Sequence, residues 1–312
     1  MGPRTRALAR IAGAAVLLAT SHAAFAARGH AAALPWWAWP LILFATTFVM
    51  GIIAVVGGIG GGVLFVPIVG GFFPFHLDFV RGAGLMVALC SALASGPGLL
   101  RSGLASLRLA MPLALAGSVG GIIGALVGLA LPTRVVQLSL GITILLIAAL
   151  MWGTRGTLDT GKHPADRLAL ALGLHGRYDD PALSAPVEWR ARNTPAGLAV
   201  FFGIGIVGGL FGLGAGWANV PALNLLMGIP LKLAVGTSGL SISIINTSAA
   251  WVYMNKGALL PVLIVPSILG VMLGARVGVR VLKGIQASVA RNVIIAMLLL
   301  SGTRSLLQGL GI

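Results

Sequence analysis

The chain has 312 residues, of which 58% are hydrophobic and only 9% are charged. Soluble domains carry about 25% charged residues because water must solvate their surface, so this composition excludes a soluble protein and predicts a lipid environment. The formal net charge of +15 does not indicate nucleic-acid binding, since the Lys and Arg residues fall singly between apolar runs, as at the ends of membrane spans.

The first 30 residues have the layout of a secretory signal peptide or of an uncleaved signal anchor. Arg4, Arg6 and Arg10 precede an apolar stretch, and the A-x-A pattern of residues 24–26 follows it. Both alternatives place residue 35 on the outer side of the membrane.

The rest of the chain is a tandem duplication. At an offset of 154 residues, the motif Gly-Ile-Gly-Gly-Gly at 58–62 falls on Gly-Leu-Gly-Ala-Gly at 212–216, and further Gly and Pro residues coincide without a gap. Matching Gly and Pro residues mark backbone geometry and not lipid solubility. The sequence predicts two transmembrane repeats, 35–153 and 196–312, joined by a polar cytoplasmic loop, 154–195, that contains five of the six acidic residues.

Each repeat contains five apolar segments, most of them near the roughly 20 residues that cross a bilayer as a helix. They are 36–57, 60–73, 78–100, 109–131 and 134–152 in the first repeat, and 196–211, 214–228, 232–254, 258–281 and 287–311 in the second. The predicted fold is an all-α polytopic membrane protein with about 8–10 membrane segments.

The number of crossings per repeat decides whether the repeats are parallel or inverted. Four crossings make them parallel, whereas five, with a bend at the Gly motif, make them inverted. With residue 35 outside, five crossings leave twelve Lys and Arg residues inside and five outside, as the positive-inside rule requires. This split favours inverted repeats with Gly-broken helices at the centre, although 60–73 is short and could be a half-helix.

Few residues within the repeats can do chemistry. Asp78 is the only carboxylate there, and His76 beside it is the only imidazole. This inventory provides no acid pair, metal-ligand set or nucleophile with a base, so neither an enzyme nor a cofactor or metal site is predicted. Neutral polar residues are clustered in the second repeat instead: Asn219, Asn224, Thr237, Ser238, Ser241, Ser243, Asn246, Thr247 and Ser248.

The two Gly motifs are the main candidates for a substrate site. Each follows one apolar helix and opens another, so its glycines allow a tight turn and the next helix presents N–H groups and a positive dipole end to an anion. Paired broken helices in inverted halves indicate a transporter's central site. The alternative is that the glycines only allow close helix packing. The predicted binding residues are Gly58, Gly60, Gly61, Gly62, Arg81, Gly212, Gly214, Gly216, Asn219, Thr237, Ser238 and Asn246.

These motifs, with Pro67 and Pro221 and the run Ala-Val-Gly-Thr-Ser at 234–238, resemble the sulfite exporter TauE/SafE family of bacterial transporters. The resemblance spans both repeats and implies a multi-pass protein of the inner cell membrane that moves small sulfur-containing anions such as sulfite, thiosulfate or organosulfonates. Arg-Gly-Ala-Gly at 81–84 departs from the second repeat's pattern, so the site is expected to be asymmetric.

The predicted function is therefore transport of a small anion across the bilayer, without nucleic-acid partners. The scarcity of carboxylates disfavours a metal cargo, while N–H groups, hydroxyls, amides and Arg81 suit an oxyanion. The alternatives are a membrane scaffold or assembly factor that carries nothing, and a transporter of a neutral solute or metal. In a scaffold, the Gly motifs would be packed shut.

Overall fold

A computed structural model of the chain describes residues 35, 37–56, 62–101, 103–153, 165–178, 187–214, 216–282 and 287–311. The predicted signal segment, residues 1–30, lies outside these residues, as do three of the predicted binding glycines, Gly58, Gly60 and Gly61. The described part of the chain is almost entirely helical, which confirms the predicted all-α membrane fold.

Each predicted apolar segment corresponds to helical structure, with ends that differ by a few residues. The first half contains α2 (Ala38–Val56), α3 (Gly62–Phe72), α4 (Leu77–Arg101), α5 (Leu107–Ala130) and α6 (Thr133–Gly153). The second contains α8 (Thr194–Phe211), α9 (Gly216–Pro221), η1 (Ala222–Leu226), α10 (Leu231–Asn255), α11 (Pro261–Leu282) and α12 (Ala287–Leu310). Within the described residues, five helices are long and apolar enough to cross a membrane: α4, α5, α8, α10 and α11.

The segment that follows each Gly motif is half the usual length. Helix α3 has 11 residues. The corresponding stretch of the second half is the six-residue α9 continued by the five-residue π-helix η1. At 1.5 Å per residue each extends about 16 Å, roughly half of a hydrocarbon core of about 30 Å. The described part of the predicted segment 60–73 is thus a half-helix.

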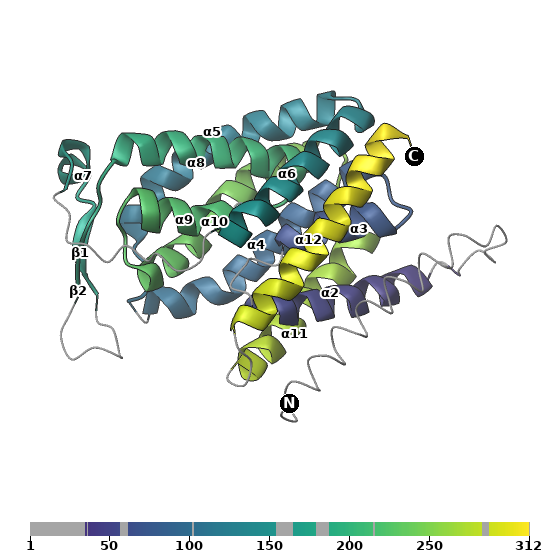
Figure 1. Cartoon of the computed structure of the whole chain (residues 1–312), viewed down its shortest axis with the longest axis horizontal. Helices are drawn as coiled ribbons and strands as arrows, with labels where there is room; N and C mark the ends of the chain where they lie inside the picture. The colour runs from purple at the N-terminus through teal and green to yellow at the C-terminus, as the bar shows by residue number, and fades with distance from the viewer. Residues whose placement is uncertain are drawn as a thin grey trace.

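Two long helix pairs join the halves. Helix α2 lies along α11 and α5 along α8, at opposite edges of the molecule (Figure 1). A Cβ on Gly120 would overlap the Phe202 carbonyl, and one on Gly274 would overlap the Phe48 carbonyl, so only glycine lets these backbones approach. Both the two glycines and the two phenylalanines are 154 residues apart, so the two contacts are equivalent under the duplication.

Contacts along α5 and α8 fix their relative direction. Gly117 of α5 lies against Phe201 of α8, and Gly128, three turns further on, lies against Leu210. The neighbours advance together along both helices, so α5 and α8 run parallel.

Helix α10 runs parallel to α5 and antiparallel to α4. The backbone N–H of Ser106, before α5, donates to Thr237 Oγ1 near the start of α10 (3.1 Å), while Ala125 shares a buried cluster with Tyr253 near its end. Gly82, at the start of α4, also lies against Tyr253. Helices α8 and α10 both run parallel to α5. The α9–η1 segment between them must therefore bring the chain back to the end of the bundle where α8 began.

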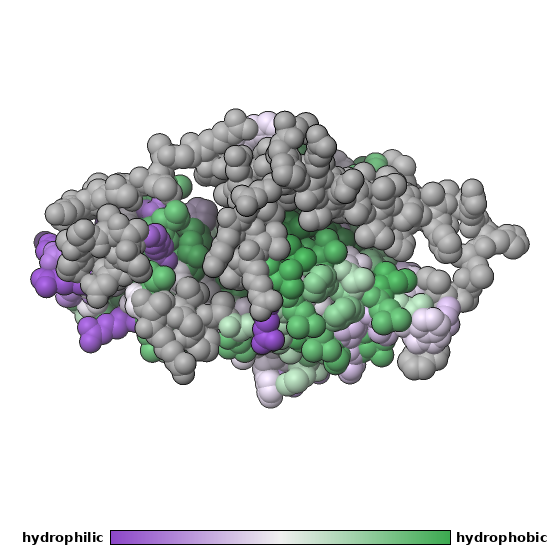
Figure 2. Space-filling model, turned by 90° about the horizontal axis from the view of Figure 1, so that it is seen from below, coloured by the Kyte–Doolittle hydropathy of each residue, from purple (hydrophilic) through white to green (hydrophobic). Residues whose placement is uncertain are grey.

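Apolar side chains cover the outside of the helices. Figure 2 shows hydrophobic residues over the middle of one face and hydrophilic residues gathered at one end. Among the exposed side chains are Leu115, Val119 and Ile123 of α5, and Val265 and Leu269 of α11. An exposed apolar surface of this kind is covered by lipid in a membrane protein.

The polar connection between the halves has more structure than the sequence predicted. Its described part contains α7 (Arg167–Ala171) and a two-stranded antiparallel sheet of β1 (His175–Tyr178) and β2 (Val187–Arg190). Asp166 accepts hydrogen bonds from the N–H (3.2 Å) and hydroxyl (2.7 Å) of Thr194, the first residue of α8, where a helix favours negative charge. Trp189 is buried, so this connection packs onto the bundle.

Candidate functional site

The second Gly motif forms the turn between α8 and α9, and it meets the first at α4. Gly212 and Gly214 both have φ +69°, a left-handed conformation that glycine adopts without strain. A Cβ on Gly214 would lie 2.8 Å from the Cβ of Ala88, and one on Gly62, the first residue of α3, would overlap the same atom. The position of a Cβ on Gly62 also lies 3.2 Å from the Leu213 carbonyl oxygen. Gly62 and Gly214 therefore converge on Ala88 of α4.

Two buried amides follow the second motif without hydrogen-bond partners. Asn219 lies on α9, which begins at Gly216, and Asn246 lies on the neighbouring α10. Both side chains are fully buried, and within the described part of the chain neither Nδ2 nor Oδ1 of either has a partner. Asn246 Nδ2 lies 3.5 Å from the position of a Cβ on Gly214, so this amide faces the Gly turn.

Unpaired buried amides are uncommon in native proteins. Leaving such a group without a partner costs about 1–3 kcal/mol, and each instance requires an explanation such as a bound molecule or ion. Close packing alone does not explain four unpaired polar atoms on two neighbouring helices. A bound polar molecule would give these atoms hydrogen-bond partners.

Thr237 and Ser238 are also buried, but they lie apart from Asn246. Ser238 precedes Asn246 by eight residues on α10, about 12 Å along the helix axis. The Thr237 hydroxyl already accepts the Ser106 N–H, which ties α10 to the turn before α5. The prediction that these residues share one polar wall with the amides stays a prediction.

Most other polar residues of the second half are bonded locally. Asn224 donates to the Ile229 carbonyl (2.8 Å), and four hydroxyl groups on α10 donate to carbonyls one turn earlier. These four belong to Ser241, Ser243, Thr247 and Ser248. Membrane helices commonly satisfy Ser and Thr in this way.

The first half offers no equivalent amides. The positions that correspond to Asn219, Thr237 and Asn246 are Phe65, Ala83 and Ala92, and all three are buried in apolar clusters. The polar atoms at the junction therefore come from the second half.

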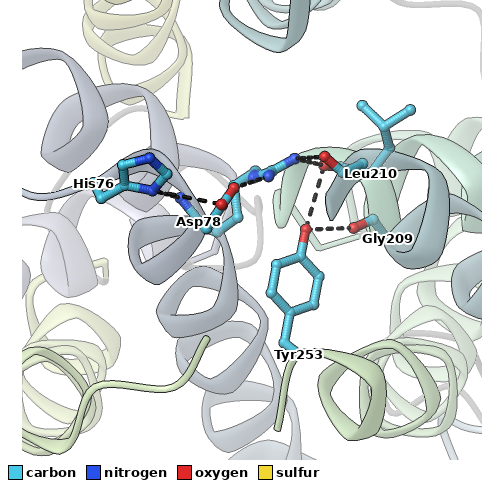
Figure 3. A network of polar contacts seen from close by, with 7 residues as sticks. His76, Asp78, Gly209, Leu210 and Tyr253 are labelled. Atoms are coloured by element: carbon cyan, nitrogen blue, oxygen red, sulfur yellow. Dashed lines mark hydrogen bonds and ion pairs between the residues drawn. The ribbon is translucent and has the colours of Figure 1, made fainter. Parts of the chain in front are cut away.

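Arg81 is fully buried near the start of α4, but its guanidinium has other partners (Figure 3). Nη1 donates to the carbonyls of Gly128 (3.0 Å) and Leu210 (2.9 Å), near the C-terminal ends of α5 and α8, and Nη2 pairs with Asp78. A helix C-terminus favours positive charge, and the carboxylate neutralises it. Arg81 thus joins three helices.

Tyr253 of α10 extends this network. Its hydroxyl donates to the carbonyls of Gly209 (3.1 Å) and Leu210 (3.4 Å), and its ring lies 5.8 Å from the Arg81 guanidinium. Figure 3 shows Tyr253 reaching Gly209 and Leu210 from one side, with Asp78 and His76 on the other. Sequence reasoning missed Tyr253, and the only signal for the Asp78–Arg81 pair was its three-residue spacing on a helix.

We expect Arg81→Met to destabilise the protein by about 1–3 kcal/mol, because it leaves the partly exposed Asp78 carboxylate and two carbonyl groups without the guanidinium. Tyr253→Phe removes one hydroxyl and should cost only about 1 kcal/mol. Thermal unfolding of the purified variants in detergent measures both. Adding Asp78→Asn to Arg81→Met should recover part of the loss, and an Arg81→Met protein as stable as its parent would contradict the assigned role.

Comparison with known proteins gives two matches. The family model described as sulfite exporter TauE/SafE matches residues 43–305. A protein of Bacillus subtilis (strain 168), named probable membrane transporter protein YunE, is 23% identical over 278 residues, which cover 86% of this chain and 98% of that protein. No solved structure matches the chain.

Proposed function

Because the chain belongs to the sulfite exporter TauE/SafE family, and is thus a multi-pass membrane transporter of a small solute, we propose that its substrate is a small sulfur-containing oxyanion or organosulfonate. Sulfite, thiosulfate and simple sulfonates are the candidates. The observation that supports this most is the pair of unpaired buried amides: Asn246 faces the Gly turn, and Asn219 lies on the helix that follows it. Their N–H groups can donate hydrogen bonds to an oxyanion.

The proposed site consists of the Gly turn and these two amides. Gly62, Gly212 and Gly214 let the chain pack closely against α4, and Asn219 and Asn246 supply polar contacts from two helices. Neutral donors also suit transport, since a substrate must bind weakly enough to leave again. Thr237 and Ser238 are proposed to extend this polar wall toward the start of α10.

The alternative functions, a scaffold or a metal transporter, predict different side chains at these positions. A scaffold that carries nothing would gain stability from paired or apolar side chains at positions 219 and 246. The tight contact of Gly62 and Gly214 with Ala88 suits close packing, but it does not explain the amides. A metal cargo needs oxygen, nitrogen or sulfur ligands, and within the described residues no three His, Cys, Asp or Glu side chains come together.

Uptake by proteoliposomes tests the proposal. Vesicles that contain the purified full chain should accumulate labelled sulfite, thiosulfate or a small sulfonate faster than protein-free vesicles, and should not accumulate glycerol or a divalent metal. Accumulation of glycerol or the metal alone would support an alternative cargo, and no accumulation of any of them would favour a scaffold.

We also infer that the repeats are inverted, related by a pseudo-two-fold axis in the membrane plane. Equivalent contacts recur between the halves: Gly82 lies against the Ala258 carbonyl just as Gly236 lies against that of Leu104. The antiparallel direction of the equivalent helices α4 and α10 supports inversion, as does the return of the chain through α9 and η1.

This topology predicts that residues 170 and 256 lie on opposite sides of the membrane. We expect Lys256→Cys, after α10, to react with an impermeant thiol reagent on intact cells, and Leu170→Cys, on α7, to react only after lysis. Both side chains are exposed, and Cys90, the chain's only cysteine, is first replaced by Ala. Labelling of both positions from the same side would contradict inversion.

A further inference from the structure

The charge of the candidate site restricts the class of ligand that it can bind. Among the side chains that the structure describes, Arg81 is the only buried charged one, and Asp78 pairs with it. The backbone of Arg81 lies against Gly212 of the Gly turn, but the Nη atoms of its guanidinium pair with Asp78 and with the carbonyls of Gly128 and Leu210. The sequence between α2 and α3, residues 57–61, is Gly-Gly-Ile-Gly-Gly and adds no charge. The ligand therefore meets no net positive charge from these residues.

A neutral, buried site disfavours a doubly charged ligand. Moving an ion out of water costs several kcal/mol unless opposite charge compensates it, and for a simple ion this cost rises roughly with the square of the charge. Amide N–H groups can replace part of the hydration of a monoanion, whereas a dianion would need at least one cationic partner at the site.

The amide oxygens set a second requirement. Each Asn side chain has two N–H donors and one carbonyl acceptor, and the acceptors of Asn219 and Asn246 are as unpaired as the donors. An anion with only acceptors would leave both Oδ1 atoms unpaired and close to its own oxygens. A ligand that carries a donor group of its own would satisfy both kinds of atom.

Resting on the proposed function, we propose that the transported species is a monoanion that also bears a hydrogen-bond donor, and that dianions are excluded. Hydrogensulfite has this chemistry, and so do sulfonates with a hydroxyl group. Sulfite takes up a proton near neutral pH, so it would cross as hydrogensulfite, with one proton and one net negative charge per ion. A proton gradient would then act on its transport without a titratable residue in the site.

Two sulfonates of one charge and nearly one size test the donor requirement. The ligands 2-hydroxyethanesulfonate and 1-propanesulfonate differ by a hydroxyl in place of a methyl group. Calorimetric titration of the purified full chain should show about tenfold or tighter binding of the hydroxylated ligand, the amount expected for one satisfied buried acceptor. Equal affinities would overturn the donor requirement.

The charge requirement is tested with sulfite and sulfate. Sulfite should bind more weakly at mildly basic than at mildly acidic pH, as hydrogensulfite is lost, while 2-hydroxyethanesulfonate, whose charge is constant, should bind equally at both. Sulfate should not bind. The exclusion of dianions would be overturned if sulfite or sulfate bound as tightly at basic pH as hydrogensulfite binds at acidic pH.

A matched variant tests whether the Asn246 amide binds the ligand. Asn246→Asp keeps the size of the side chain, removes its N–H donors and adds negative charge, so it should weaken binding of 2-hydroxyethanesulfonate more than tenfold. Unchanged binding would overturn the assignment to Asn246. If none of the anions binds the parent protein at either pH, the proposed function itself fails, and this inference fails with it.

Discussion

Asn246→Leu is expected to abolish transport and, at the same time, to make the empty protein more resistant to heat. Leucine has the same number of side-chain heavy atoms as asparagine, branched at the same carbon, and no polar atoms. The parent side chain is fully buried with both polar atoms unpaired, so its replacement should remove a penalty of about 1–3 kcal/mol. A gain in stability with a loss of function is characteristic of a residue retained for binding.

Asn224→Leu is the matched control. Asn224 is also buried in the second half, but its amide donates to the Ile229 carbonyl (2.8 Å). The same substitution should therefore destabilise the protein by about 1 kcal/mol or more. Thermal unfolding in detergent compares the two variants. If Asn246→Leu lowers the unfolding temperature as Asn224→Leu does, Asn246 has a structural role and the assignment of this amide to the site is wrong.

Gly214→Ala is expected to stop transport, whereas Gly257→Ala should not. Both glycines have φ +69°, so both substitutions impose the same backbone strain, about 1–2 kcal/mol. A Cβ at Gly257 meets nothing within 4 Å. At Gly214 it would lie 2.8 Å from the Ala88 Cβ and 3.5 Å from Asn246 Nδ2, where the ligand is proposed to bind. Uptake by proteoliposomes, normalised to the amount of folded protein, measures the difference.

A second substitution separates packing from ligand binding at Gly214. Ala88→Gly removes the atom that the new Cβ would contact. In the double variant, the thermal stability should return toward that of Gly257→Ala, while transport should stay impaired because the Cβ still faces Asn246. Full recovery of transport in the double variant would mean that Gly214 serves helix packing only.

Local patterns predicted the helices well. Apolar segments bounded by Gly, Pro and charged residues gave all the described membrane helices, because lipid leaves the backbone no alternative to internal hydrogen bonds. The segment at 60–73 was predicted to be short, with a half-helix left open as an alternative, and its described part, α3, has 11 residues. The folded part of the connection between the halves was not predicted, because its stability depends on burial of Trp189 and Leu174 against the bundle.

The candidate site was only partly predictable. The sequence identified the clustered polar residues but could not tell Asn224, whose partner Ile229 follows in the next turn, from Asn246, which has none among the described residues. Arg81 was expected to offer its charge to a substrate. Its carbonyl partners lie 47 and 129 residues away in the chain, so no local pattern reveals that Nη1 of the guanidinium is occupied.

Transport by the double variant Asn219→Leu/Asn246→Leu tests the central claim most directly. Reconstituted at the same density as the parent, it should unfold at a temperature at least as high as the parent does. It should nevertheless show no uptake of labelled sulfite or 2-hydroxyethanesulfonate above that of protein-free vesicles. Uptake at the parent rate by this stable, amide-free protein would contradict the claim that these two side chains bind the transported anion.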